Sequence, residues 1–158
     1  MMSEHSTSIR WTNTGGDFLQ KEYSRDHSIE FPNGRKIEGS AAAAYGGNPE
    51  NLDPEAAFTA SLSSCHMLTF LAICSVRGFI VESYDDDAVG YLDKNLEGKV
   101  CMTRVVLRPL VQFFVGTEAG VPDSEQLAML HERAHRACFI SNSVKTSVEI
   151  ESREQSEN

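Results

Sequence analysis

The chain has 158 residues, with 14 Lys and Arg against 23 Asp and Glu, and a formal net charge of −9 at pH 7. This length is typical of one domain that buries its own core, so we expect a single domain over residues 1–158, ordered over about 9–151. The acidic balance argues against nucleic acid and anionic membrane surfaces as partners. The N-terminus lacks the apolar stretch of a signal peptide, and the four cysteines are widely spaced. A cytoplasmic location is therefore expected.

The first third of the chain has the pattern of β-structure. Gly15 and Gly16 predict one turn, and the Pro-Asn-Gly sequence at residues 32–34 predicts a tight turn. Strands are expected near residues 9–12, 22–31 and 35–40, and an irregular loop over residues 41–52.

A long apolar helix is predicted over residues 53–77. Asp53 is a typical N-cap, Pro54 suits the first helical position, and Gly78 suits the C-terminal stop. Residues 56–76 contain no Asp, Glu, Lys or Arg, and such a run is long enough to cross a bilayer. Its many Ser and Thr side chains argue against a membrane span. We expect instead a central helix of a soluble protein, packed on several sides.

Strands dominate again after this helix. Pro109 removes one ladder donor, so the strand that contains it should be bulged or lie at an edge. The acidic run at residues 85–87 lacks the spacing of a calcium loop and is expected to be a solvated turn. The predicted strands cover residues 79–84, 88–93 and 99–115, with a hairpin turn at 95–98.

A second helix is predicted from Pro122 and Asp123, with Gln126 completing a capping box. Its inner stripe is expected to comprise Leu127, Leu130, Ala134 and Ala137. Alternating side chains over residues 144–150 predict a final half-buried strand. Strand runs separated by single helices indicate an α+β fold, with helices packed on antiparallel sheet.

Cys65 is the strongest candidate for chemistry. Along the predicted helix it shares a polar stripe with Ser61 and Thr69, whereas Cys74 lies on the opposite, apolar side. A thiol with polar neighbours can do redox chemistry, while Cys74 and Cys101 are expected to be inert buried thiols. Cys138 is expected to lie at a helical break, because Ser141 and Asn142 follow it.

The histidines are expected to be structural. His66 follows Cys65 directly, but adjacent helical side chains diverge by about 100° and do not form a Cys–His pair. His131 and His135 are four residues apart and could bind a metal, but no further ligand stands at a confirming spacing. Two surface histidines is the favoured interpretation, and no metal or cofactor is expected. A metal site of Cys65, His66 and His135 has the least support.

Two segments together resemble the OsmC/Ohr family of hydroperoxide-reducing proteins. DPEAAFTASLSSCHM, residues 53–67, is similar to the family's N-P-E-x₉-C signature, with Asp53 in place of Asn. AHRACFISNSVKTSVEI, residues 134–150, is similar to its second helix, second cysteine and closing strand. Another Asn-Pro-Glu stands at residues 48–50, but only Glu55 lies ten residues before Cys65. The resemblance covers roughly residues 9–151 and implies the OsmC-like fold, with antiparallel sheets packed around a long central helix.

The resemblance also implies a mechanism. Cys65 would attack a hydroperoxide to give a sulfenic acid, Cys138 would resolve it to a disulfide, and an external dithiol would reduce that disulfide. An arginine would activate the thiol and Glu55 would orient that arginine. Arg25 is the first choice for this arginine and Arg35 the reserve.

The position of Glu55 bears on assembly. In one continuous helix, Glu55 and Cys65 are about 15 Å apart along the axis. Either the N-terminus of the helix bends back, or Glu55 serves the Cys65 of another subunit. The second option fits the intertwined homodimer that the resemblance implies.

Two functions from different classes remain open. The first is a thiol-dependent peroxidase acting on organic hydroperoxides or hydrogen peroxide. The second is a non-catalytic protein on the same fold that binds a small apolar ligand or stress signal.

Overall fold

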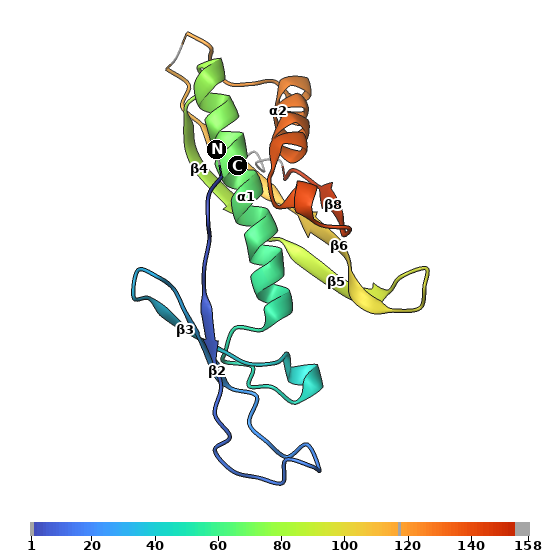
Figure 1. Ribbon diagram of the computed structural model, residues 1–158. Coiled ribbons are helices and arrows are strands. Elements are labelled where there is room, and N and C mark those ends of the chain that lie inside the picture. Colours follow the sequence, from blue (N-terminus) through green and yellow to red (C-terminus); the bar gives the residue numbers. More distant parts are fainter. Residues whose placement is uncertain (1, 117, 154–158) are drawn as a thin grey trace. The chain divides into compact units, whose positions relative to one another are not determined.

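The computed structural model describes residues 2–116 and 118–153 and has a mixed α+β architecture, as predicted (Figure 1). The chain divides into two compact units that meet in sequence between Ala57 and Phe58. The single domain over residues 1–158 stays a prediction.

The first unit is built on a three-stranded antiparallel sheet. Its strands lie in the order β1-β2-β3 and comprise β1 (Ser8–Arg10), β2 (His27–Glu30) and β3 (Lys36–Gly39). The predicted turn between β2 and β3 is present, with Gly34 at a φ of 81°. The strand expected over residues 22–31 is shorter than predicted. The preceding chain turns on itself instead, since Glu22 N donates to Asp17 O at 2.9 Å. The loop before the first helix contains one 3-10 turn, η1 (Ala43–Tyr45).

The long helix α1 (Pro54–Arg77) has the predicted bounds. Asp53 Oδ1 accepts a hydrogen bond from Ala56 N at 2.8 Å, which is the expected N-cap. At the other end Gly78 has a φ of 80°, a left-handed conformation that ends the helix. By length and composition α1 could cross a membrane, but this is weak evidence because core helices of soluble proteins meet the same criterion.

The second unit contains two sheets. One pairs β4 (Val81–Asp86) with β7 (Pro109–Phe113), and the other has the order β5-β6-β8. Its members are β5 (Val89–Lys94), β6 (Val100–Leu107) and β8 (Ser147–Ile150). The single strand expected over residues 99–115 is therefore wrong. Pro109 has no N–H to continue the ladder, and the chain passes from one sheet to the other at Arg108.

The closing strand differs in direction from the expected antiparallel arrangement. β8 runs parallel to β6, with Val105 opposite Val148, whereas the other pairings between strands are antiparallel in the described residues. A parallel pair needs a long connection, and here the chain returns through the helix α2 (Ser124–Ala137) and the 3-10 turn η2 (Ser141–Ser143). The strand is also shorter than the predicted 144–150.

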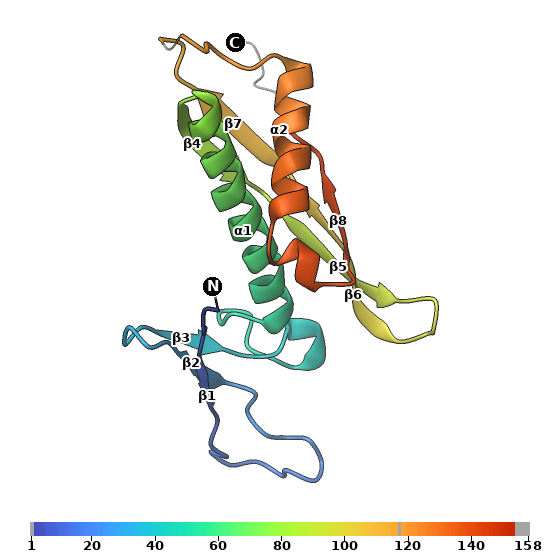
Figure 2. The ribbon, with the colours of Figure 1, turned by 45° about the horizontal axis from the view of Figure 1, so that its top comes forward.

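The helices pack side by side on the strands of the second unit (Figure 2). Phe70 and Cys74 of α1 contact Leu130 and Ala134 of α2 in one buried cluster. A second cluster joins Leu62 of α1 to β6. α1 therefore packs against both α2 and the strands.

α2 begins with the predicted capping box of Asp123 and Gln126. Its buried stripe, however, is Leu130, His131 and Ala134, whereas Ala137 is exposed. The predicted inner position of Ala137 is wrong because the helix ends there and the chain turns away.

One side of α1 is exposed but uncharged. It is formed by small and apolar residues about four apart, namely Ala60, Ser64, Leu68, Ala72 and Val76. Leu68 is 61% exposed and Val76 88% exposed. The prediction of packing on several sides is thus only partly met within one chain.

Candidate thiol site

Cys65 and Cys138 meet between the two helices of the second unit. Cys65 lies in the middle of α1 and is half-buried, whereas Cys138 is fully buried at the C-cap of α2. Both are free thiols, and their side chains are close enough for each to shift the pKa of the other. Cys138 has an extended backbone conformation, so it lies at the helical break that the sequence predicted.

Backbone amides after α2 surround the two sulfurs. Ser141 N donates to Cys138 Sγ at 3.5 Å, and the backbone N–H groups of Phe139 and Ile140 point toward Cys65. The turn is held locally, since Asn142 N donates to Cys138 O at 3.1 Å. Convergent N–H groups stabilise negative charge on sulfur. Residue types could not predict this group of N–H donors, because backbone atoms supply them.

The environment gives the two thiols different acidities. Burial raises the pKa of Cys65, and its hydrogen bond to Cys138 raises it further. Burial alone would also raise the pKa of Cys138, but hydrogen bonds from Cys65 and from Ser141 and Ile140 outweigh it and lower that pKa. The two thiols therefore perturb each other, and the amides after α2 favour the thiolate of either one.

The remaining cysteines lie away from this pair. Cys74 is buried in the core cluster of α1 and α2, and burial raises its pKa to about 11. Cys101 lies in β6, opposite Asp93 of β5. Cys74 is buried as predicted, whereas Cys101 is only partly buried, and the inertness of both stays a prediction.

Two histidines pair inside the core. His66 and His131 are both buried, and His66 Nε2 lies 3.1 Å from His131 Nδ1. The ring of His131 also stacks on Phe70 at a centroid distance of 4.3 Å. His66 is a core histidine, as expected, but the surface position predicted for His131 is wrong. Its spacing of four residues from Leu127 and three from Ala134 is the signal that could have identified it as buried.

The described residues contain no group of three or more His, Cys, Asp or Glu side chains that could hold a metal ion.

The acidic run at residues 85–87 is not a solvated turn, because β4 extends to Asp86. Asp86 is half-buried and accepts hydrogen bonds from Ser63 of α1 and from the backbone of Arg108.

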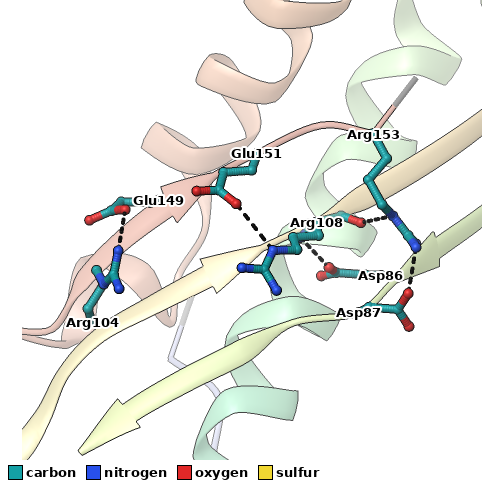
Figure 3. Close-up of polar contacts among 7 residues, drawn as sticks. All are labelled: Asp86, Asp87, Arg104, Arg108, Glu149, Glu151 and Arg153. Atoms are coloured by element: carbon teal, nitrogen blue, oxygen red, sulfur yellow. Dashed lines mark hydrogen bonds and ion pairs between the residues drawn. The ribbon is translucent and has the colours of Figure 1, made fainter.

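Asp87 is exposed and pairs with Arg153 at 2.5 Å (Figure 3). Figure 3 also shows the ion pairs of Arg104 with Glu149 and Arg108 with Glu151 on the same side of the sheet. Such exposed pairs contribute little stability.

The other predicted site residues belong to the first unit. Arg25 is half-buried, donates to Tyr23 O and Gly46 O at 3.3 Å each, and lies 5.0 Å over the Tyr23 ring. Arg35, the reserve, is exposed in the turn before β3, and Glu55 lies in the first turn of α1. Their membership of the thiol site stays a prediction.

Arg25 also borders an aromatic cavity in the first unit. The cavity has a volume of about 380 Å³ and is lined by Ile9, Trp11, Phe18, Tyr23, Arg25 and His27. Phe18 and Tyr23 stack with ring centroids 4.7 Å apart. This feature was not predicted, since the aromatic residues are scattered along the sequence.

Comparison with known proteins agrees with this architecture. The family model for OsmC-like protein matches residues 47–153. The structure of an OsmC-like protein of unknown function from Vibrio cholerae is 47% identical, with a TM-score of 0.90, and the match covers 96% of this chain and 100% of that one. A comparison with curated proteins gave no match.

More distant structures share the fold. An organic hydroperoxide resistance protein from Elizabethkingia anophelis is 21% identical with a TM-score of 0.66, covering 96% of both chains. The organic hydroperoxide resistance protein OhrB of Bacillus subtilis is 19% identical with a TM-score of 0.64, covering 94% of this chain and 98% of that one.

Proposed function

Because the chain belongs to the OsmC-like protein family, we propose that it is a thiol-dependent peroxidase that reduces organic hydroperoxides or hydrogen peroxide at Cys65. The observation that carries this proposal is that the half-buried thiol of Cys65 and the buried thiol of Cys138 lie close enough to interact, beside the same backbone amides. Two free thiols in contact can pass from sulfenic acid to disulfide without a large movement. Structural relatives described as organic hydroperoxide resistance proteins support a peroxide as the substrate.

Cys65 is the attacking thiol because it is the more exposed of the pair. Its proton is first lost to solvent, while Cys138 keeps its own proton. The Cys65 thiolate then attacks the terminal oxygen of the hydroperoxide, the O–O bond breaks, and the alkoxide takes a proton from solvent to leave as an alcohol. Cys65 is thereby oxidised to a sulfenic acid.

Cys138 completes the cycle as the resolving thiol. Its sulfur attacks the Cys65 sulfur, the S–S bond forms, and the departing hydroxide takes the Cys138 proton to leave as water. The amides around residues 139–141 stabilise the thiolate form of either sulfur. An external dithiol then supplies two electrons by thiol–disulfide exchange and restores both thiols.

Arg25 and Glu55 are proposed to assist the first step. A guanidinium beside Cys65 would favour its thiolate and polarise the peroxide, and a carboxylate would orient that guanidinium. We place this chemistry in a cytoplasmic homodimer. The uncharged exposed side of α1 supports the dimer, because large exposed apolar patches mark interfaces.

The test is peroxide consumption with cumene hydroperoxide and dithiothreitol. The Cys65→Ser variant should consume peroxide only at the uncatalysed rate, because serine cannot form a sulfenic acid. The matched Cys101→Ser variant makes the same substitution outside the site and should retain full turnover. Undiminished turnover in Cys65→Ser would overturn the proposal.

The aromatic cavity favours a second candidate, a non-catalytic protein that binds a small apolar ligand. Trp11 is the only tryptophan in the chain and lines this cavity, so its fluorescence reports occupancy. Cumyl alcohol has the aromatic body of the test peroxide without the O–O bond. Saturable quenching by cumyl alcohol, together with no peroxide turnover in the unmodified protein, would favour this candidate.

A further inference from the structure

Asp86 ties the central helix to both sheets of the second unit. Its Oδ2 accepts a hydrogen bond from Ser63 Oγ at 2.5 Å, and its Oδ1 accepts one from Arg108 N at 2.6 Å. Figure 3 shows the second contact, at the point where the chain passes from β6 to β7. One carboxylate at the end of β4 therefore holds a helix side chain and the junction between the sheets.

The rotation of α1 about its axis needs such a contact. A helix with one apolar face is oriented by burying that face, but α1 is apolar on both its buried and its exposed sides. Leu62 and Phe70 are fully buried, whereas Leu68 and Val76 are exposed. Hydrophobic burial alone therefore gives only a small difference in free energy between orientations of α1 that differ by a small rotation about its axis. Directional polar contacts, which are lost when the geometry changes, distinguish them strongly.

The position of the reacting thiol depends on this rotation. Ser63 and Cys65 are two residues apart and so point to nearly opposite sides of the helix. Ser63 points toward Asp86 while Cys65 points toward Cys138. With side chains about 5 Å from the axis, a rotation of about 20° moves the Cys65 sulfur by roughly 2 Å. Such a shift is enough to separate two thiols that now lie close together.

We infer that Asp86 is a positioning residue that, through Ser63, fixes the rotation of α1 and keeps the Cys65 thiol in contact with Cys138. The importance of this contact for turnover rests on the proposed peroxidase function. The contact itself can be tested without any peroxide.

The chain supplies matched controls. Asp87 follows Asp86 directly, but its side chain is 78% exposed and pairs with Arg153 instead of the helix. Ser147 is an exposed serine at the start of β8, away from α1. Asp87→Asn and Ser147→Ala therefore repeat the chemistry of Asp86→Asn and Ser63→Ala without touching the proposed contact.

The experiment measures the rate at which diamide, a thiol oxidant, forms the Cys65–Cys138 disulfide, followed by peptide mapping. Ser63→Ala and Asp86→Asn should slow this reaction by about tenfold or more, because misplacement by 1 Å or more is costly for reacting groups. Ser63→Thr restores the hydroxyl and should recover most of the rate, which a merely structural loss would not do. Both control variants should react like the unmodified protein.

Two results would overturn the inference: an unchanged rate in Ser63→Ala, or an equal slowing in Ser147→Ala. If Asp86→Asn does not fold, the Ser63 variants still decide, since they leave the Asp86–Arg108 contact in place. A different result would show that the proposed peroxidase function is wrong. The unmodified protein would then form the disulfide with diamide but would not consume cumene hydroperoxide.

Discussion

His66 Nε2 lies 3.1 Å from His131 Nδ1 in the core between α1 and α2, and both rings are almost fully buried. Burial lowers the pKa of His66 to about 4, with a further contribution from His135, while Asp86 opposes this shift. Burial, followed by the charge of His66, lowers the pKa of His131 to about 3. The folded protein therefore keeps this pair neutral.

Stability should consequently fall as the pH decreases from about 6.5 to 4. In this window the unfolded chain, with ordinary histidine pKa values, binds more protons than the folded one. Each histidine contributes a slope of up to about 1.4 kcal/mol per pH unit to the free energy of unfolding. Urea unfolding at pH 7, 6 and 5 measures this slope.

The double variant His66→Leu/His131→Leu should reduce the slope, because both buried titrating groups are gone. His5→Ala removes an exposed histidine and serves as the control, with an unchanged slope. If the double variant keeps the full pH dependence, the buried pair is not its source.

Oxidation should produce a disulfide between Cys65 and Cys138 of the same subunit. The two thiols already lie close together within one chain, so no partner thiol is needed. The protein is treated with one equivalent of cumene hydroperoxide, free thiols are blocked, and the peptides are mapped by mass spectrometry. Mixing isotopically heavy and light chains before oxidation distinguishes pairing within a chain from pairing between chains. Over-oxidation of Cys65 to the sulfinic acid, with Cys138 still a free thiol, would show that Cys138 does not resolve.

The protein should sediment as a homodimer at micromolar concentration. We expect the uncharged side of α1 to be covered, so Ala72→Glu should shift the equilibrium toward monomer by placing a charge in the interface. Ala128→Glu makes the same change on the exposed side of α2 and should leave the dimer intact. A stable, active monomer in the unmodified protein would rule out the obligate dimer.

Gly90→Ala should destabilise the second unit by about 1–3 kcal/mol. A Cβ atom at Gly90 would lie 2.3 Å from Thr59 Oγ1 and 2.5 Å from the terminal methyl of Met102, so α1 and β5 would have to move apart. Urea unfolding measures the loss. In a double-mutant cycle Thr59→Ala should relieve part of it, whereas strictly additive losses would argue against the close contact.

The sequence by itself determined the features that depend on neighbouring residues. The bounds of α1 follow from Asp53, Pro54 and Gly78, and the start of α2 follows from its capping box. Caps and turns are local, since each involves side chains and amides a few residues apart. The different burial of Cys65 and Cys74 was also predictable, because helical periodicity alone places them on different sides of α1. The α+β class followed from the order of such elements.

Only the tertiary structure decided which distant residues meet. The contacts of Cys65 with Cys138, His66 with His131 and Ser63 with Asp86 join segments separated by many residues. The division at Pro109 and the parallel direction of β8 likewise depend on how α2 returns the chain to the sheet. Local sequence carries little information on such pairings, because they are selected by packing of the whole unit. The position of Cys65 on α1 could therefore be predicted from the sequence of that helix. The acidity of Cys138 and the contact of Asp86 with the helix could not.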